Sequence, residues 1–181
     1  QQSDKNRLPI AKARANRLSI DWTAYAPPQP ACPGLTVLDD YDLAELTAHI
    51  DWSPFFATWE LKGRFPGILD DAVVGEAARQ VYDDARAMLQ RIVGEKWLRA
   101  RAVVGLWPAN ATGDDIEIYA DETRGRVLAI IHTLRQQMAR GEGGRANLAL
   151  ADFIAPKDSG KIDYLGAFAV TAGIGLDDVV K

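Results

Sequence analysis

The residues of this sequence best suited to chemistry are an aspartate and the aromatic side chains around it. Asp51 is followed directly by Trp52, and Phe55, Phe56 and Trp59 come soon after. A carboxylate attracts a cation by charge, and the faces of aromatic rings attract it through their quadrupoles. The grouping therefore favours a binding site for a ligand that carries a cationic group.

A structural role for the same aspartate is equally well supported by spacing. Ser53-Pro54 predicts a short helix, with a capping hydroxyl followed by proline at the first helical position. Asp51 would then only help to cap that helix. The spacing of the residues leaves both roles open.

The other acidic residues, the cysteine and the histidines favour structural roles. Most acidic pairs precede predicted helices or strands, where a carboxylate caps free backbone N–H groups or stays solvated. These pairs are Asp39/Asp40, Asp70/Asp71, Asp83/Asp84, Asp114/Asp115 and Asp177/Asp178. Cys32 lies among prolines, with no lysine or histidine beside it to activate a thiolate. We expect His132 to be a core histidine in an apolar strand and His49 to interact with a helix C-terminus.

One nucleotide-binding pattern is matched only formally. Gly141, Gly143 and Ala146 fit G-x-G-x-x-A, but that fingerprint needs a strand before the turn and a helix after it. The polar residues 135–140 precede it and an irregular stretch follows, so residues 141–144 are expected to form a flexible surface loop.

Composition excludes several classes of protein. The 181 residues are 48% hydrophobic and 25% charged, the balance of a globular domain. The longest apolar run is 127–131, far short of the about 20 residues of a membrane-spanning helix. One cysteine and two histidines exclude a disulfide framework and a multi-cysteine or histidine-rich zinc site.

Charge is distributed unevenly along the chain. Residues 1–17 hold five basic side chains and one acidic one, and the remainder is acidic. The basic segment has no aromatic residue to stack on a base and no apolar stretch of a secretory signal, so a solvated linker or leader is favoured over a nucleic-acid arm. The acidic remainder argues against nucleic acid as a partner.

Periodicity predicts helices first and neighbouring strands later. After an extended proline-rich connection over 27–34, a helix is expected to start at residues 39–42, a second at Ser53, and a long one over 71–94. Strands are expected over 102–107, where Pro108 ends the run, and over 115–119, 127–134 and 164–171, with a hairpin loop at 121–125. This order favours an α+β fold with a largely antiparallel sheet.

Residues 41–66 and several later blocks resemble a known family, the C-terminal activation domain of cobalamin-dependent methionine synthase. The first block contains His-Ile-Asp-Trp-Ser-Pro-Phe-Phe-Ala-Thr-Trp-Glu-Leu-Lys-Gly-Arg-Phe-Pro. The later blocks are Ala-Val-Val-Gly-Leu-Trp-Pro-Ala-Asn (102–110), Asp-Asp-Ile-Glu-Ile-Tyr (114–119), Leu-Arg-Gln-Gln (134–137), Leu-Ala-Asp-Phe-Ile-Ala-Pro (150–156), Ser-Gly (159–160) and Asp-Tyr-Leu-Gly-Ala-Phe-Ala-Val (163–170).

The resemblance implies a function as well as a fold. It implies a twisted, largely antiparallel sheet with flanking helices, and a groove for S-adenosylmethionine to which Asp51 contributes a contact. Trp52, Phe55 and Trp59 are expected to be mainly scaffold. It further implies reductive methylation of cob(II)alamin to methylcobalamin, with the cobalamin held by a neighbouring domain and the electron supplied by flavodoxin or a flavoprotein reductase. Zinc would lie only on other domains of the parent enzyme, and the location would be cytoplasmic.

The chain departs from the family pattern at its end. The family's principal S-adenosylmethionine motif, an arginine followed by Gly-Tyr-Pro, should come well after Asp163, and the sequence holds no such motif. We therefore expect residues 1–19 to be a basic interdomain tether and residues 20–181 an incomplete N-terminal portion of the activation domain that binds the ligand feebly by itself. The rival hypothesis is a non-catalytic docking module for a corrinoid protein or a reductase.

Overall fold

The computed structural model describes residues 7–139 and 144–180, which divide into two compact units. Unit 1 comprises Gln1–Thr36 and Val104–Phe168, and unit 2 comprises Val37–Val103 and Ala169–Lys181. The elements, in chain order, are α1 (Ile10–Ala15), β1 (Gly34–Tyr41), α2 (Leu43–Thr47), α3 (Trp52–Thr58), η2 (Gly67–Asp70), α4 (Gly75–Gly94), β2 (Arg99–Thr112), β3 (Asp115–Tyr119), β4 (Val127–His132), η3 (Leu150–Phe153), η4 (Lys157–Ser159), β5 (Asp163–Ile174) and α5 (Leu176–Val179).

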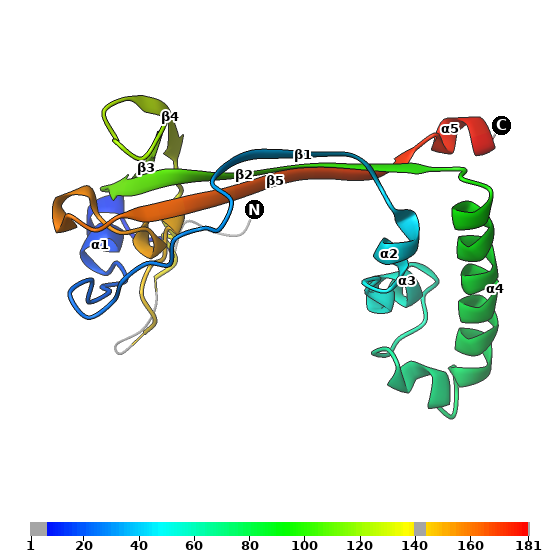
Figure 1. Cartoon of the computed structure of the whole chain (residues 1–181). Helices are drawn as coiled ribbons and strands as arrows, with labels where there is room; N and C mark the ends of the chain where they lie inside the picture. The colour runs from blue at the N-terminus through cyan, green and yellow to red at the C-terminus, as the bar shows by residue number, and fades with distance from the viewer. Residues whose placement is uncertain (1–6, 140–143, 181) are drawn as a thin grey trace. The chain divides into compact units, whose positions relative to one another are not determined.

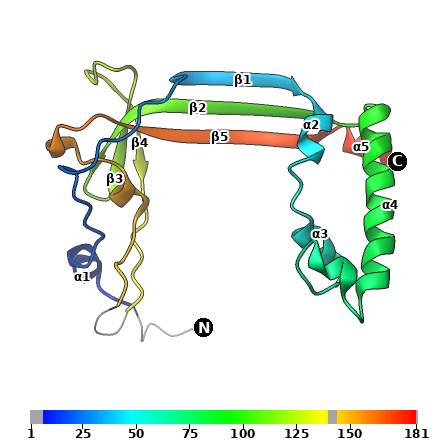
Figure 2. The ribbon, with the colours of Figure 1, turned by 60° about the horizontal axis from the view of Figure 1, so that its bottom comes forward.

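A largely antiparallel sheet with flanking helices confirms the predicted α+β class. The strand order is β1-β2-β3-β4, and β5 pairs with β2 (Figures 1 and 2). β2 and β3 pair antiparallel from Ala109↔Ile118 to Thr112↔Asp115, and β3 pairs antiparallel with β4. Among the described residues, no helix is long and apolar enough to cross a membrane.

The core of unit 1 lies under the β2–β3–β4 hairpins. Its buried members are Ala109, Ala111, Ile116, Ala151 and Ile154. The predicted hairpin loop at 121–125 is confirmed, and its Arg124 binds back to the sheet. That guanidinium donates to the carbonyl of Ala109 at 3.1 Å and to the carbonyl of Asp163 at 3.0 Å, so the loop holds β2 beside the start of β5.

The helices of unit 2 follow the sequence patterns closely. The long predicted helix is confirmed as α4, with Asp71 accepting hydrogen bonds from the N–H groups of Val73 and Val74 just before it. These bonds to backbone N–H groups also lower the pKa of Asp71. The role predicted for Asp71 at a helix start is therefore confirmed.

Three sequence expectations about the elements are corrected by the structure. The helix expected to start at residues 39–42 begins at the late end of that range, as α2 with Asp42 as its N-cap. Residues 34–41 before it form a strand, in which Asp39 and Asp40 lie 3.1 and 3.5 Å from Arg101 and Arg99 on β2. β2 also continues through Pro108. Its pairing with β3 begins only at the next residue, so that ladder does not need the missing N–H of proline.

The third concerns the basic N-terminal segment, which is mostly exposed, as expected, but contains a helix that was not predicted. Residues 10–15 form α1, and Ala13 is fully buried. A short helix with one buried alanine has too weak an apolar pattern to be recognised in a basic sequence.

A buried arginine joins distant parts of unit 1. Arg135 donates five hydrogen bonds, one for each of its N–H groups: two to Asp114, two to Asp152 and one to the carbonyl of Asn147, all at 2.7–2.8 Å. Its side chain is 0% exposed, and those of Asp114 and Asp152 are 11% and 4% exposed. Burial is the largest single influence on both aspartates and disfavours their charged forms. The hydrogen bonds and charge of Arg135, together with Arg14 at Asp114 and the N–H of Ala149 at Asp152, outweigh it and lower the pKa of both aspartates.

We expect Arg135→Met to lower the free energy of unfolding by about 3–5 kcal/mol, because it leaves two buried carboxylates without their main partner. Urea denaturation of the full chain measures the change. The control is Arg101→Met, which breaks an exposed ion pair and should cost less than about 1 kcal/mol. Equal effects of the two substitutions would contradict the role given to Arg135.

The lowered pKa values also predict a dependence on pH. Asp114 and Asp152 have folded-state pKa values below the ordinary 3.8, so their contribution is present above that pH and is lost as the pH falls through the lower folded values. In Arg135→Met the two carboxylates lack that partner, and their protonation at low pH removes the cost of burying unpaired negative charge. The difference in unfolding free energy between wild type and variant should therefore shrink as the pH falls below about 4, measured by urea denaturation; a constant difference would contradict this.

Candidate functional site

Asp51 is the N-cap residue of α3, in unit 2. Its Oδ1 accepts a hydrogen bond from the backbone N–H of Ser53 at 3.0 Å, and its backbone is extended, with φ −79° and ψ 109°. The residue is exposed, and Oδ2 accepts no hydrogen bond from the residues that the structure describes. One oxygen therefore holds the helix start, and the other carries charge that remains available to a ligand.

The capping role predicted for Ser53 is wrong. The helix begins at Trp52, so Ser53 and Pro54 occupy its second and third positions, and the serine contributes its backbone N–H as a donor. Proline at the third position costs nothing, because the first turn of a helix has no internal acceptor for that N–H. The structural role considered for Asp51 is thus present, and it uses only half of the carboxylate.

The aromatic residues after Asp51 form the core of unit 2. Phe56 is fully buried with Ile68 and Ala78. The ring of Trp52 packs edge-on against Tyr82 of α4, with 4.8 Å between centroids, and against Phe55 at 5.4 Å. Most of these rings pack between α3 and α4 and so hold the backbone that carries Asp51. Figure 1 shows the two helices side by side.

An apolar groove of about 570 Å³ lies between α3 and α4. It is lined by Ile50, Trp52, Phe55, Trp59, Val81, Asp84, Ala85, Met88, Leu89 and Ile92. Asp51 does not line it, although both of its sequence neighbours do. Trp59, 59% exposed, is the most accessible ring of the group. The carboxylate that lines the groove is that of Asp84, and Asp51 adjoins it only through its neighbours Ile50 and Trp52. A carboxylate among apolar walls suits a cation with an apolar body.

The other acidic pairs have varied roles. Asp177 and Asp178 lie in the first turn of α5, as expected for a helix start. Asp84 lies inside α4, where it accepts from Gln80 at 3.2 Å, so its expected place at a helix start is wrong. Asp114 is no cap either, because Arg135 and Arg14 bind it. No pattern in the sequence indicates either ion pair, since both arginines lie far from Asp114 along the chain.

The histidines, the cysteine and the glycine pattern add no further chemistry. The expectation of a core His132 is wrong: its side chain is 78% exposed and lies 3.1 Å from Asp115, because β4 is an edge strand and this register pairs the two residues. His49 is exposed just after α2, and Cys32 is a free, exposed thiol. Gly141 and Gly143 lie outside the described residues. Within the described ranges, no group of three His, Cys, Asp or Glu residues could hold a metal ion.

Comparison with known proteins identifies the class of domain to which this fold and site belong. Residues 42–181 match the family model of the vitamin B12-dependent methionine synthase activation domain. The chain therefore belongs to that family, as the resemblance in residues 41–66 predicted.

A solved structure supports the same assignment in three dimensions. A crystal structure of the MetH reactivation domain bound to AdoHcy matches with a TM-score of 0.88 and 48% sequence identity. The match covers 97% of this chain and 53% of that chain, so the sequence spans about half the length of the relative it matches.

The aromatic core yields a prediction about which rings support the site. We expect Phe56→Ala to lower the free energy of unfolding by about 3–5 kcal/mol, because it opens a cavity in a packed cluster. Trp59→Ala, at the residue that follows the same helix, should cost less than about 1 kcal/mol, because most of that side chain is exposed. Chemical denaturation followed by circular dichroism measures both, and a Trp59 effect as large as that of Phe56 would contradict the assignment.

Proposed function

We propose that this chain is part of a reactivation module that binds S-adenosylmethionine for the reductive methylation of cob(II)alamin to methylcobalamin, with Asp51 as a ligand contact. The observation that carries the proposal is the 48% identity to a domain whose crystal structure contains AdoHcy. A bound S-adenosylmethionine supplies the methyl group and cobalamin accepts it. This chain supplies binding and orientation.

The role of Asp51 follows from its geometry. S-adenosylmethionine carries two positive groups, a sulfonium and an ammonium, and each is attracted to a carboxylate. Oδ1 is held by Ser53, so the carboxylate keeps one orientation, and Oδ2 can accept a hydrogen bond from a ligand ammonium or lie beside a sulfonium. Capping and binding are therefore compatible in one side chain.

The partners in this proposal are those of a reactivation cycle. The basic segment 1–19 is the tether to the cobalamin-binding domain of the same polypeptide, and residues 20–181 are the N-terminal portion of the activation domain. Flavodoxin or a flavoprotein reductase supplies the electron, and zinc belongs to other domains of the parent enzyme. The setting is the cytoplasm.

A second function, a docking module that has lost ligand binding, is favoured by one observation. The groove between α3 and α4 is almost wholly apolar and open to solvent, as a protein-binding surface would be. The two functions differ in one measurable property, which is the affinity for S-adenosylmethionine.

Calorimetric titration of the full-length protein tests the role of Asp51. We expect Asp51→Asn to weaken S-adenosylmethionine binding by about 1–3 kcal/mol, because an amide still caps α3 but no longer attracts a cation. Asp42→Asn is the matched control. Asp42 caps α2 with the same bond, to the N–H of Ala44 at 2.9 Å, and its substitution should leave the affinity unchanged.

Titration with S-adenosylhomocysteine distinguishes the two cationic groups. That ligand keeps the ammonium but lacks the sulfonium charge. An equal loss for both ligands in Asp51→Asn indicates contact with the ammonium, and a loss confined to S-adenosylmethionine indicates the sulfonium. Unchanged affinity for both would refute the role of Asp51, and absence of binding by the wild-type protein would favour the docking module.

A further inference from the structure

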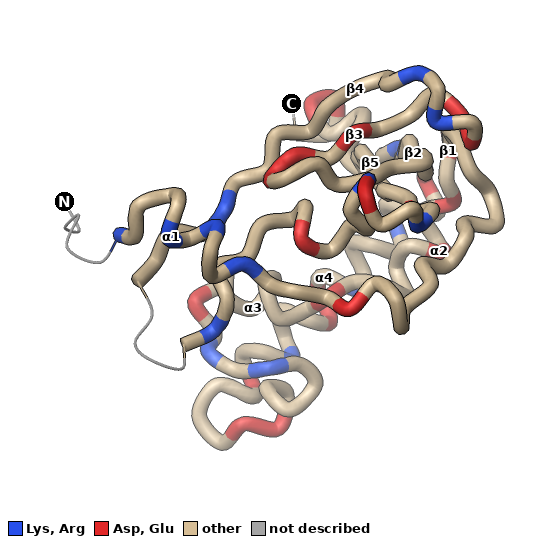
Figure 3. The backbone as a smooth tube through the Cα atoms, turned by 90° about the vertical axis from the view of Figure 1, so that its left-hand side faces the viewer, with Lys and Arg blue, Asp and Glu red and all other residues tan. Residues whose placement is uncertain are grey.

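Residues 7–23 of unit 1 cross the surface of that unit and are held at their start by backbone pairing. The N–H of Leu8 donates to the carbonyl of Gln137 at 2.7 Å, and the side-chain amide of Gln137 donates back to the carbonyl of Leu8 at 2.8 Å. The segment then forms α1 and continues past Trp22. Figure 3 marks its basic residues in blue.

Two polar side chains anchor the middle of this segment. Arg14 Nε donates to Asp114 Oδ2 at 2.7 Å, on the carboxylate that Arg135 also binds. Asn16 Nδ2 donates to Asn147 Oδ1 at 2.8 Å, and the backbone N–H of Asn147 donates to the carbonyl of Asn16 at 2.8 Å. The anchors are therefore one ion pair and a small set of hydrogen bonds.

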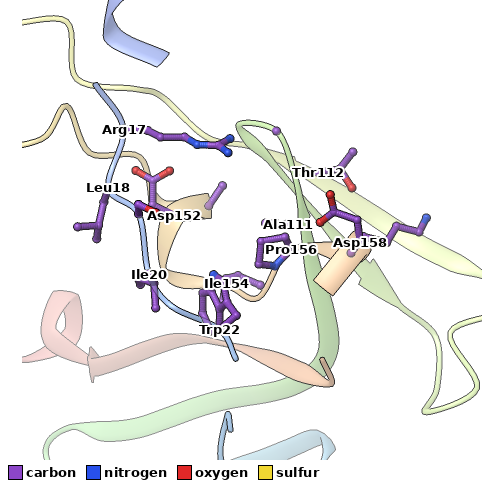
Figure 4. Close-up of a pocket in the computed structure, with 14 residues that line it drawn as sticks. Arg17, Leu18, Ile20, Trp22, Ala111, Thr112, Asp152, Ile154, Pro156 and Asp158 are labelled. Atoms are coloured by element: carbon purple, nitrogen blue, oxygen red, sulfur yellow. The ribbon is translucent and has the colours of Figure 1, made fainter. Parts of the chain in front are cut away.

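Apolar contacts along the same segment are sparse. Ala13 is the one buried residue of 7–23, whereas Leu18, Ile20 and Trp22 are half-buried. They line one side of an open pocket of about 500 Å³, whose other walls include Ala111, Ile154 and Pro156 (Figure 4). A second pocket, of about 410 Å³, is lined by residues 112–115 together with Arg14 and Arg17. Because most of its side chains are exposed and it borders open pockets, the segment gains little hydrophobic stabilisation from its contacts with unit 1.

We propose that residues 7–23 form a strap that docks reversibly on unit 1 through Arg14 and Asn16, and that its release lengthens the connection to the preceding domain. The first half of this proposal stands on the contacts in unit 1. The second half rests on the proposed role of residues 1–19 as a tether.

Charge screening is the natural release signal. The side chain of Arg14 is 60% exposed, so dissolved ions weaken its attraction to Asp114, whereas the fully buried Arg135 keeps its bonds. Residues 7–19, once freed, would span on the order of 20 Å as a flexible chain. That length is enough to change which surfaces a tethered neighbour can reach.

The docked arrangement is consistent with the related crystal structure. That match covers 97% of this chain, which leaves room for only a few unmatched residues. Most of the strap therefore has a counterpart in the reactivation domain bound to AdoHcy.

Hydrogen exchange of the full-length protein tests the docking. We expect Arg14→Ala to speed exchange of the α1 amides about fivefold, the effect of losing one partly exposed ion pair. Lys12→Ala removes the same charge from the same helix, but its ammonium has no partner among the described residues, so it should leave those rates unchanged. Raising the salt from about 0.1 M to about 1 M should speed wild-type exchange and leave Arg14→Ala nearly unaffected.

Exchange of amides elsewhere in unit 1, and a second variant at Asn16, serve as controls. Amides of β3 and β4 should exchange normally in Arg14→Ala, which shows that unit 1 remains folded, and Asn16→Ala should release the same α1 amides. Equal effects of Arg14→Ala and Lys12→Ala, or no effect of salt on the wild type, would overturn the strap.

Small-angle scattering of the full-length protein tests the lengthening. At low salt the maximum dimension of Arg14→Ala should exceed that of the wild type, by at most the span of about 20 Å of the freed segment, and that of Lys12→Ala should not. Faster exchange of the α1 amides without an increase in the maximum dimension would overturn only the proposal that release of the strap lengthens the connection to the preceding domain. Neither readout depends on S-adenosylmethionine, so failure of the proposed function would be seen separately, in the calorimetry.

Discussion

The guanidinium of Arg135 is the interaction on which unit 1 most depends, because it lets three separate stretches of chain share one buried centre. It binds Asp114 at the β2–β3 turn, Asp152 in η3 and the carbonyl of Asn147. All five of its N–H groups are used, which is what makes burial of these charges tolerable. Through Asp114 the same centre also receives Arg14 from the N-terminal segment.

Unit 2 depends instead on packing between aromatic rings, which fixes the start of α3 and the carboxylate that caps it. Its aromatic rings pack α3 against α4, and the cap bond to Ser53 fixes one oxygen of Asp51. Because the cap needs only that oxygen, the side chain that starts the helix can also meet a ligand. The two roles that the sequence left as alternatives are physically compatible.

The sequence predicted those elements whose structure is decided by a local pattern of residues. α4 follows from apolar residues at steps of three and four, and the β3–β4 hairpin follows from alternation on either side of a short loop. β1 was missed because Asp39 and Asp40 resemble a helix start, whereas the helix begins only after Asp42 and these two residues pair with arginines on β2. Local propensity was overruled there by contacts between distant residues.

By itself, then, the sequence determined the α+β class, the family and the long helix, since each depends on neighbouring residues or on ordered motifs. Tertiary structure alone decided that Asp114 binds an arginine instead of capping a strand, and that residues 7–23 dock on unit 1. The physical reason is separation along the chain: Arg135 lies 21 residues from Asp114, and Arg14 lies 100 residues from it. No local pattern records such pairs, because they form only once folding has brought the segments together.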